Sequence, residues 1–371
     1  MTERETARAT PVLLAARELG LGGSERQVAE TALALDRRHF EPHVACFTGG
    51  GFRARELTGA GVPVLDLGLR SLMAPSMVLS ASRLGRYLSG HGIQLVHAFD
   101  VPANLFAVPV ARWNRVPVVL SSQRAHRGLT PGPQRHLLRL IDRMVDGIVV
   151  NSQSVARELA GEDGVPASMI RLAYNGVDTA AFSPDGPRAP IPWTDGEPVA
   201  GIVCALRPEK GLHVLLEAFA KVRNVRLLIV GSGPLRGELE GRARELGLGA
   251  ACHFQPAVAN VAEWLRAIDI FVLPSLSEAL SNSLLEAMAC GCCPIASDTG
   301  GNPELVTHGE TGLLFPSGDA NALASRLRIV LADPELRHRL AAAAELRARS
   351  TFARESAAVR MGAIYREFLG S

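Results

Sequence analysis

The chain has 371 residues, of which 47% are hydrophobic and 20% are charged. This composition can bury substantial cores, and the length predicts a globular protein of two domains. A net charge of +2, with both signs mixed along the chain, argues against a nucleic-acid partner. No apolar run reaches the roughly 20 residues of a membrane-spanning helix, and the opening MTERETARAT is too polar for a signal peptide, so we expect a cytoplasmic protein.

The cysteines and lysines carry separate information. The six cysteines follow no spacing typical of a disulfide framework or a zinc site, so we expect no metal. The run Cys290-Gly291-Cys292-Cys293 is predicted to supply small core residues at a helix-to-strand turn. Only Lys210 and Lys221 of the 39 basic residues are lysine, which suggests that a retained lysine serves as a point charge.

Short apolar runs bounded by glycine alternate with amphipathic stretches in the first half of the chain. Parallel strands covered on both faces have this continuous apolar character, so the alternation predicts a doubly wound parallel α/β domain. The expected strands are residues 12–16, 44–47, 64–67, 95–98, 118–121 and 147–150.

The pattern stops between residues 175 and 198, where five prolines and several glycines are typical of a linker. It then restarts, with strands expected at residues 199–205, 226–230, 252–254, 270–273, 294–296 and 312–315. We therefore predict a first domain at 1–180, a linker at 181–198 and a second α/β domain at 199–351. Residues 352–369 have the pattern of an amphipathic helix. Ligands of doubly wound sheets bind at the carboxyl ends of strands, so the site is expected in a cleft between the two domains.

A glycine loop, Leu19-Gly20-Leu21-Gly22-Gly23-Ser24-Glu25-Arg26-Gln27, follows the first expected strand and opens a helix. Ser24 and Gln27 match a capping box, while Gly22 and Gly23 would leave backbone amides accessible at the positive helix end. A diphosphate would suit that position. A tight strand-to-helix turn that needs glycine explains the loop equally well, and the loop is no GxGxxG fingerprint.

A second loop, Leu206-Arg207-Pro208-Glu209-Lys210-Gly211, follows the first strand of the second domain. Two cations beside a helix N-terminus suit a phosphate whose charge grows as it leaves. A solvated turn is the alternative. The local repulsion between two cations and a positive helix end favours an anion.

The most specific segment is PSLSEALSNSLLEAMACG at residues 274–291. A strand ends at Pro274, a polar loop carries Glu278, and a helix begins near Ser281 with Glu286 one to two turns along it. The two carboxylates could hold polyhydroxyl groups on either side of a diphosphate bound to the amides of residues 279–283. A surface salt-bridge role would be the safer reading of an isolated glutamate pair.

This segment resembles the E-x7-E motif of the retaining glycosyltransferases called family 4, here Glu278 to Glu286, and the resemblance continues through Gly300-Gly301-Asn302-Pro303-Glu304. It also takes in residues 22–25, 95–98, 175–178 and 208–211, in the order of the family. The resemblance implies the GT-B fold, in which two Rossmann-like domains face each other across a cleft, and a final helix, here 352–371, that returns to the first domain.

The resemblance also implies roles for individual residues. Glu286 would bind the ribose hydroxyls, Glu278 would contact the donor sugar, and Lys210 would stabilise the leaving phosphate. The predicted diphosphate contacts are Leu280, Ser281, Asn282 and Ser283, with Gly22 and Gly23 from the first domain. Such enzymes need no divalent ion, and we expect neither metal nor cofactor.

Three departures from the family pattern concern the site. The family's arginine in Gly-Arg-Leu falls at Ala205, so Arg207 is predicted to replace it in catalysis. His97 is retained where many members have His-x-His, but the second histidine is Phe99, which leaves a catalytic role of His97 open. A glycine and a proline often found after the first glutamate are Ala279 and Ser281.

The implied reaction is a retaining transfer from a nucleoside-diphosphate sugar to a hydroxyl acceptor. A diphosphate oxygen takes the acceptor's proton, and no protein nucleophile is needed. We prefer a UDP-sugar as the donor, with GDP-mannose second, and a saccharide, lipid-linked sugar or small molecule as the acceptor. The alternatives are a nucleotide-sugar epimerase, or a catalytically impaired sugar-nucleotide binder, on the same scaffold.

Acceptor contacts are expected from loops of the first domain, and the candidates are Asp100, Asn104, Arg124, His126 and Arg127. Residues 134–145 repeat arginine at 135, 139 and 143 beside several leucines. This pattern is compatible with peripheral contact to an anionic membrane at its inner face, and a solvated basic face over a packed helix is the alternative.

Overall fold

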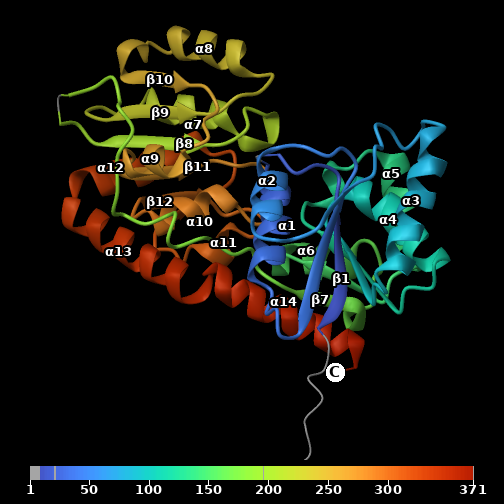
Figure 1. The fold of residues 1–371 in the computed structure, drawn as a ribbon. Helices are drawn as coiled ribbons and strands as arrows, with labels where there is room; N and C mark the ends of the chain where they lie inside the picture. Colours follow the sequence, from blue (N-terminus) through green and yellow to red (C-terminus); the bar gives the residue numbers. More distant parts are fainter. Residues whose placement is uncertain (1–8, 21, 195, 371) are drawn as a thin grey trace, which may run out of the picture. The chain divides into compact units, whose positions relative to one another are not determined.

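The computed structural model describes residues 9–20, 22–194 and 196–370. The polar opening segment that argued against a signal peptide lies mostly in residues 1–8, outside the described residues. The chain divides into two compact units (Figure 1): unit 1 comprises residues 1–176 and 354–371, and unit 2 comprises 177–353. None of the described helices combines the length and the apolar character needed to cross a membrane.

Unit 1 contains a seven-stranded sheet of order β3-β2-β1-β4-β5-β6-β7, in which every pairing is parallel. The strands are β1 (Thr10–Ala16), β2 (Phe40–Cys46), β3 (Val64–Asp66), β4 (Leu95–Ala98), β5 (Val118–Gln123), β6 (Gly147–Val150) and β7 (Ile170–Leu172). All six expected strands are confirmed. The short strand β7 was not predicted, because its three half-buried residues include Arg171 and form no apolar run.

The helices of unit 1 cover both faces of this sheet. They are α1 (Gly23–Ala34), α2 (Phe52–Gly59), α3 (Ser76–Gly90), α4 (Val101–Trp113), α5 (Gly132–Asp142), α6 (Gln153–Gly161) and α14 (Arg354–Leu369), with short 3-10 turns η1 (Arg127–Leu129) and η2 (Ala167–Met169). Right-handed crossovers place α1 and α2 on one face and α3, α4 and α5 on the other. Helix α1 packs against α2 and α14, whereas α4 packs against α3 and α5.

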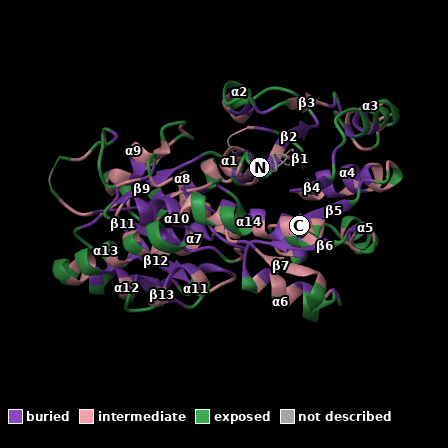
Figure 2. Ribbon diagram, turned by 60° about the horizontal axis from the view of Figure 1, so that its bottom comes forward, coloured by how far each residue is buried: buried purple, intermediate pink, exposed green. Residues whose placement is uncertain are grey.

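Helix α14 returns the chain to unit 1 and packs on α1 beneath the sheet (Figure 1). Its buried face contains Met361, Ile364 and Tyr365. The ring of Tyr365 meets that of Phe40 edge-on at 5.8 Å between centroids. These side chains belong to the main core of unit 1, together with the buried strand residues that Figure 2 shows in purple.

Unit 2 contains a six-stranded parallel sheet of order β10-β9-β8-β11-β12-β13. Its strands are β8 (Val199–Val203), β9 (Arg226–Val230), β10 (Cys252–Gln255), β11 (Ile270–Leu273), β12 (Cys293–Ser297) and β13 (Leu313–Phe315), which confirms the six that were expected. Its helices are η3 (Pro208–Lys210), α7 (Leu212–Phe219), α8 (Arg236–Glu245), η4 (Gly249–Ala251), α9 (Val261–Arg266), α10 (Asn282–Ala289), α11 (Asn302–Leu305), α12 (Ala320–Ala332) and α13 (Pro334–Thr351). The fold is therefore a pair of doubly wound parallel sheets.

The proline-rich segment 181–198 is tied to unit 2. The guanidinium of Arg266, at the end of α9, donates to the carbonyls of Ala181, Ser183 and Pro187 at 2.8–3.3 Å. The backbone amide of Ala189 also donates to the carbonyl of Glu263 at 2.9 Å. These bonds replace the hydrogen bonds that a segment without regular structure otherwise makes to water.

Candidate functional site

The strand order of unit 2 defines where a ligand can meet several loops. Strand β8 lies beside β11; from β8 the chain continues to β9 and β10 on one side, and from β11 to β12 and β13 on the other. The loops after β8 and β11 therefore leave the same sheet edge in opposite directions, which is the usual ligand-binding position of a doubly wound sheet. Lys210 lies in the first loop and Glu278 in the second.

These two loops are joined through their backbones. Gly211 has a φ of 63°, and a Cβ atom there would lie 2.1 Å from the carbonyl oxygen of Pro274. Only glycine allows this approach without strain. The amide of Leu276 then donates to the carbonyl of Glu209 at 2.8 Å. The loop after β8 and the loop after β11 thus form one surface.

The join places Lys210 against Glu278. The Lys210 Nζ lies 2.6 Å from Glu278 Oε2, and the hydroxyl of Ser275 donates to the same oxygen at 3.1 Å. The two side chains are 20% and 12% exposed. Burial alone would lower the pKa of Lys210, but the adjacent carboxylate of Glu278 outweighs it and the pKa is raised. Lys210 is therefore held as a cation whose charge Glu278 balances.

Cys204 lies near this ion pair at the end of β8. Burial raises the pKa of its thiol to about 12, an effect that the charge of Lys210 only partly opposes. The thiol is therefore protonated at neutral pH, and it is no nucleophile in this state. The other five cysteines are likewise free, and Cys290, Cys292 and Cys293 are buried, as expected for small core residues.

The loop that carries Glu278 is supported from behind by the loop after β12. A Cβ atom on Gly301 would lie 2.1 Å from the carbonyl oxygen of Ala279, and the Gly301 amide donates to the Glu278 carbonyl at 3.3 Å. The buried hydroxyl of Ser297 donates to the Ser275 carbonyl at 2.7 Å. Gly301, Ser275 and Ser297 were not predicted as site residues. The consecutive glycines at 300 and 301 are the feature of the sequence that could have indicated a close approach of two backbone segments.

Helix α10 begins immediately after this loop. Ser281 is its N-cap and its hydroxyl accepts from the Leu284 amide at 3.3 Å, so serine at this position supplies a helix cap. Leu280 and Ser281 are buried, whereas Asn282 and Ser283 are half-buried at the helix start. Glu286 is 5% exposed on the same helix. The positive end of α10 and a buried carboxylate thus follow Glu278 along the chain.

Arg207 is exposed at the N-cap of η3. Within the described part of the chain it forms no ion pair. Ala205, where the family has arginine, is also exposed. An exposed guanidinium three residues before Lys210 is available to an anion, and the substitution of Arg207 for the family's arginine stays a prediction.

Unit 1 has a switch point of its own, between β1 and β4. Asp100, after β4, accepts from the amide of Arg17, after β1, at 2.7 Å and caps α4 by accepting from the Ala103 amide at 2.8 Å. Burial raises the pKa of Asp100. Asp100 therefore ties the two loops of unit 1 together, and its acceptor contact stays a prediction.

Gly22 and Gly23 open α1 after β1, but the predicted capping box is wrong. The N-cap is Gly22, without a side-chain cap, and the helix already includes Ser24. Gln27 is buried and exchanges hydrogen bonds with the backbone of Gly176 at 3.1 and 3.2 Å. The helix begins at Gly23, one turn before Gln27, and the side chain of Gln27 bonds to Gly176 and does not cap the helix. Diphosphate contacts at Gly22 and Gly23 stay predictions.

His97 lies inside unit 1, with no exposed surface. Its Nδ1 is 2.8 Å from the hydroxyl of Tyr365, and its Nε2 is 2.8 Å from that of Ser122. Burial lowers the pKa of His97 to about 3, so the ring is neutral. Both ring nitrogens are hydrogen-bonded within the protein, so His97 links β4 to Ser122 of β5 and to Tyr365 of α14. Its catalytic role stays untested.

The remaining acceptor candidates of unit 1 are Asn104 on α4 and three residues after β5. Asn104 is buried and donates to the Ser122 carbonyl at 2.9 Å, while Arg124 bonds to Asn175 and lies 5.5 Å from the Phe99 ring. Burial lowers the pKa of Arg124 to about 10.

His126 and Arg127 each contact a carboxylate group. His126 Nδ1 is 2.5 Å from Glu158 Oε2. Arg127 is 2% exposed and donates to both carboxylate oxygens of Asp142 at 2.7 and 2.8 Å. Both side chains therefore tie the segment after β5 to α6 and α5, and their contact with an acceptor stays a prediction.

Among the described residues, no three histidine, cysteine, aspartate or glutamate side chains are grouped so that they could hold a metal ion.

Family models match most of the chain. The model described as "Glycosyltransferase Family 4" matches residues 21–181, and the model described as "Glycosyl transferases group 1" matches residues 187–347. The chain belongs to the family-4 type of glycosyltransferases. The resemblance inferred from Glu278 and Glu286 is thereby confirmed.

Curated relatives carry related names. The chain is 28% identical over 269 residues to the sulfoquinovosyl transferase of Arabidopsis thaliana, covering 67% of this chain and 52% of the relative. It is 30% identical over 280 residues to the D-inositol 3-phosphate glycosyltransferase of Pseudarthrobacter chlorophenolicus, covering 70% and 65%. The matched part therefore spans between about half and two thirds of the length of these relatives.

Solved structures show the fold. Anabaena HepE in complex with UDP is 19% identical, with a TM-score of 0.82 over 96% of this chain and 100% of that one. Sucrose-phosphate synthase from Thermosynechococcus elongatus is 22% identical, with a TM-score of 0.82 over 97% and 99%. The GT-B fold of the family-4 glycosyltransferase is thus confirmed.

Proposed function

We propose that this glycosyltransferase moves a sugar, with retention at the anomeric carbon, from a nucleoside-diphosphate sugar to a hydroxyl acceptor. The observation that carries the proposal is the Lys210–Glu278 ion pair at the switch point of unit 2, immediately before helix α10. A cation, a carboxylate and a helix N-terminus in one place match the parts of such a donor: diphosphate, sugar and ribose.

Each part of the donor has a candidate partner. Glu286 would accept from the ribose hydroxyls, and the amides from Leu280 to Ser283 would meet the diphosphate at the start of α10. Lys210 and Arg207 would neutralise the charge that develops on the departing phosphate. Glu278, which balances Lys210 in the structure, would then accept from a hydroxyl of the donor sugar.

The reaction requires no protein nucleophile. The bond between the anomeric carbon and the diphosphate oxygen breaks as the acceptor oxygen bonds to that carbon from the same face. The proton of the acceptor hydroxyl passes to an oxygen of the leaving diphosphate, so the products are a glycoside and a nucleoside diphosphate. Unit 1 would bind the acceptor, for which the candidates are Asp100, Asn104, Arg124, His126 and Arg127.

A UDP-sugar is the preferred donor, with GDP-mannose second. Structures of HepE, which share the fold, were solved with UDP and with UDP-glucose. The acceptor would belong to polysaccharide, glycolipid or glycosylated-metabolite biosynthesis. One relative is named as a D-inositol 3-phosphate glycosyltransferase, which favours a small hydroxyl compound among these classes. We further propose that the transfer needs no metal ion, because Lys210 and Arg207 supply the charge that a divalent ion would otherwise provide.

A two-stage experiment tests the proposal. Thermal shifts with UDP-, GDP-, ADP- and TDP-sugars should show strong stabilisation by the UDP-sugar, because a ligand that binds only the folded state raises the melting temperature. The stabilising donor is then incubated with hydroxyl acceptors in EDTA, and the products are analysed by NMR. An α-linked product from an α-linked donor, with free UDP, is expected. A new nucleotide sugar without free UDP would instead indicate an epimerase. Binding of the donor without any turnover would indicate a sugar-nucleotide binder.

A further inference from the structure

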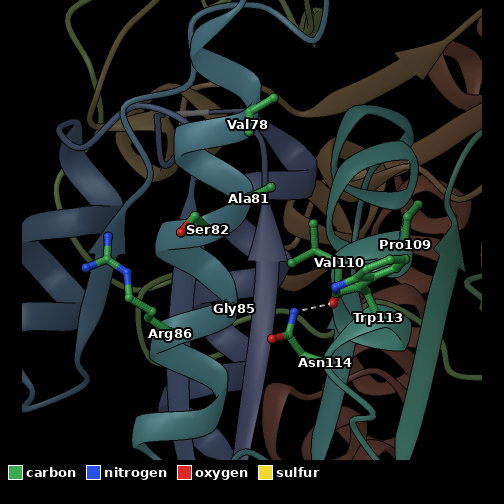
Figure 3. A pocket seen from close by; sticks show the side chains of 9 residues that line it. All are labelled: Val78, Ala81, Ser82, Gly85, Arg86, Pro109, Val110, Trp113 and Asn114. Carbon is green, nitrogen blue, oxygen red and sulfur yellow. Dashed lines mark hydrogen bonds between the residues drawn. The ribbon is translucent and has the colours of Figure 1, made fainter.

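Unit 1 has an open groove between α3 and α4, on the face of the sheet opposite α1 and α14. Figure 3 shows it lined by Val78 and Arg86 of α3 and by Pro109, Val110 and Trp113 of α4. Its volume is about 570 Å³, and none of the described candidate site residues of unit 1 lines it. No role in sugar transfer accounts for it.

Contacts between α3 and the end of α4 shape the groove. A Cβ atom on Gly85 would lie 2.8 Å from the side chain of Asn114, so glycine lets Asn114 lie against α3. Asn114 in turn donates to the Val110 carbonyl at 2.8 Å, which fixes the end of α4 (Figure 3). Trp113, the preceding residue, is thereby held with 89% of its surface exposed.

The rim of the groove and the start of α3 expose further large apolar side chains. Val78 is 69% exposed, Leu79 is 74% exposed and Met73, in the turn before α3, is 94% exposed. Single exposed apolar residues are ordinary, but four large ones on α3, on the turn before it and at the end of α4 indicate a binding surface.

The segment that forms α3 and α4 is poor in acidic residues. Between Asp66 and Asp142 the only acidic residue is Asp100, whose carboxylate is engaged at the strand ends. Of the arginines in this segment, Arg112, Arg127, Arg135 and Arg139 pair with carboxylates of other segments. Arg83 and Arg86 are exposed on α3, and among the described residues neither forms an ion pair.

We propose that the surface formed by α3 and the end of α4 docks on an anionic lipid bilayer. Trp113, Val78 and Leu79 would enter the interfacial layer, where an indole ring is favourable because one end is apolar and the other can hydrogen-bond. Arg83 and Arg86 would reach lipid phosphates while their aliphatic parts cover apolar surface. The surface thus combines the two requirements of peripheral membrane binding, buried apolar area and positive charge.

This surface differs from the one predicted at residues 134–145. In α5, Arg135 and Arg139 both donate to Asp163, at 3.2 and 3.1 Å, so a carboxylate already balances part of their charge. Among the residues that the structure describes, Arg83 and Arg86 of α3 have no such partner. The contact through 134–145 stays a prediction, and α3 with the end of α4 is the stronger candidate.

A second copy of the chain is the main competing occupant. Face-to-face pairing of this surface would bring Arg83 and Arg86 of two copies together without a carboxylate between them, which electrostatic repulsion disfavours. Anionic headgroups provide the complementary charge. The inference does not depend on the identity of the donor or the acceptor.

Flotation of the full chain with lipid vesicles tests the proposal through a matched pair of variants. Val78→Asp places a carboxylate at a 69% exposed position on α3, and Val359→Asp does the same at a 70% exposed position on α14. Wild type and Val359→Asp should float with vesicles containing phosphatidylglycerol and remain unbound with phosphatidylcholine alone. Val78→Asp and the double variant Arg83→Glu/Arg86→Glu should each bind at least about tenfold more weakly.

Fluorescence gives an independent readout of the docking residue. Anionic vesicles should shift the tryptophan emission to the blue in wild type, and Trp113→Phe should abolish the shift while keeping most of the binding. Circular dichroism melts verify that each variant is folded. Equal binding by Val78→Asp and wild type would overturn the proposal. So would a dimer in analytical ultracentrifugation that Val78→Asp alone dissociates, because the surface would then pair two copies.

Discussion

The Nζ of Lys210 and the Oε2 of Glu278 lie 2.6 Å apart, although 68 residues separate them in the chain. The contact exists because β8 and β11 are neighbours and their following loops share a backbone hydrogen bond. Removing one partner of such a pair leaves the other charge without compensation in a partly buried place. Glu278 therefore keeps Lys210 charged and in position; in the proposed function, a donor diphosphate would take over part of that role.

Replacing Lys210 by alanine is expected to reduce kcat about 100- to 1000-fold, because the leaving phosphate loses its main cation. The affinity for the nucleoside diphosphate should fall much less, since Glu286 and the start of α10 remain. Steady-state kinetics and calorimetric titration with UDP separate the two effects.

The other lysine provides the control for this variant. The Nζ of Lys221 donates to Asn321 on an exposed surface of unit 2, so Lys221→Ala should leave kcat unchanged. The double variant Lys210→Ala/Glu278→Gln removes both charges and should recover stability lost in Lys210→Ala without recovering turnover. Full activity of Lys210→Ala would refute the assignment.

Glu286 is expected to hold the nucleoside part of the donor. Glu286→Gln keeps the size of this buried side chain but removes its charge, and hydrogen bonds to a charged acceptor contribute about 1.5–3 kcal/mol. The dissociation constant for UDP should therefore rise by roughly 10- to 100-fold in calorimetric titration. Glu335→Gln, on the exposed start of α13, serves as the control and should bind UDP normally. Unchanged affinity in Glu286→Gln would exclude a ribose contact.

Of the described strands, all but β7 could be predicted, because buried parallel strands leave continuous apolar runs in the sequence. The positions of Lys210 and Glu278 at strand ends followed from the same runs. Their ion pair did not, because it depends on β8 lying next to β11, which no local pattern specifies.

Contacts between distant segments explain the other differences. Tyr365 of α14 buries His97, and Gly176 recruits the side chain of Gln27. A capping box is a local pattern. The Gln27 side chain does not form it because it donates to the carbonyl of Gly176, 149 residues away. The contact between Gly301 and the Glu278 loop could not be predicted either, since a pair of glycines in the sequence does not indicate which backbone segment lies against it.

Gly301→Ala is expected to disturb the site without touching a ligand. Its Cβ atom would lie 2.1 Å from the Ala279 carbonyl oxygen, so the Glu278 loop must shift. We expect a loss of about 1–3 kcal/mol in the free energy of unfolding and a fall in kcat of at least tenfold. Gly237→Ala, in α8, meets no atom within 4 Å and should be neutral or stabilising, because alanine favours helix. Urea unfolding and kinetics of both variants give the comparison.

The neutral state of His97 predicts a dependence of stability on pH. Burial lowers its pKa in the folded protein to about 3, whereas the unfolded chain has a value near 6.5. Between these values the unfolded state binds more protons, so acidification should reduce the free energy of unfolding, by up to about 1.4 kcal/mol per pH unit from this residue. Urea unfolding from pH 7 to pH 4.5 should show a shallower slope for His97→Asn, despite its lower stability at pH 7. The exposed His338→Asn, on α13, should keep the wild-type slope. Identical slopes in His97→Asn and wild type would contradict the prediction, because they would mean that the pKa of His97 is the same in the folded and unfolded protein.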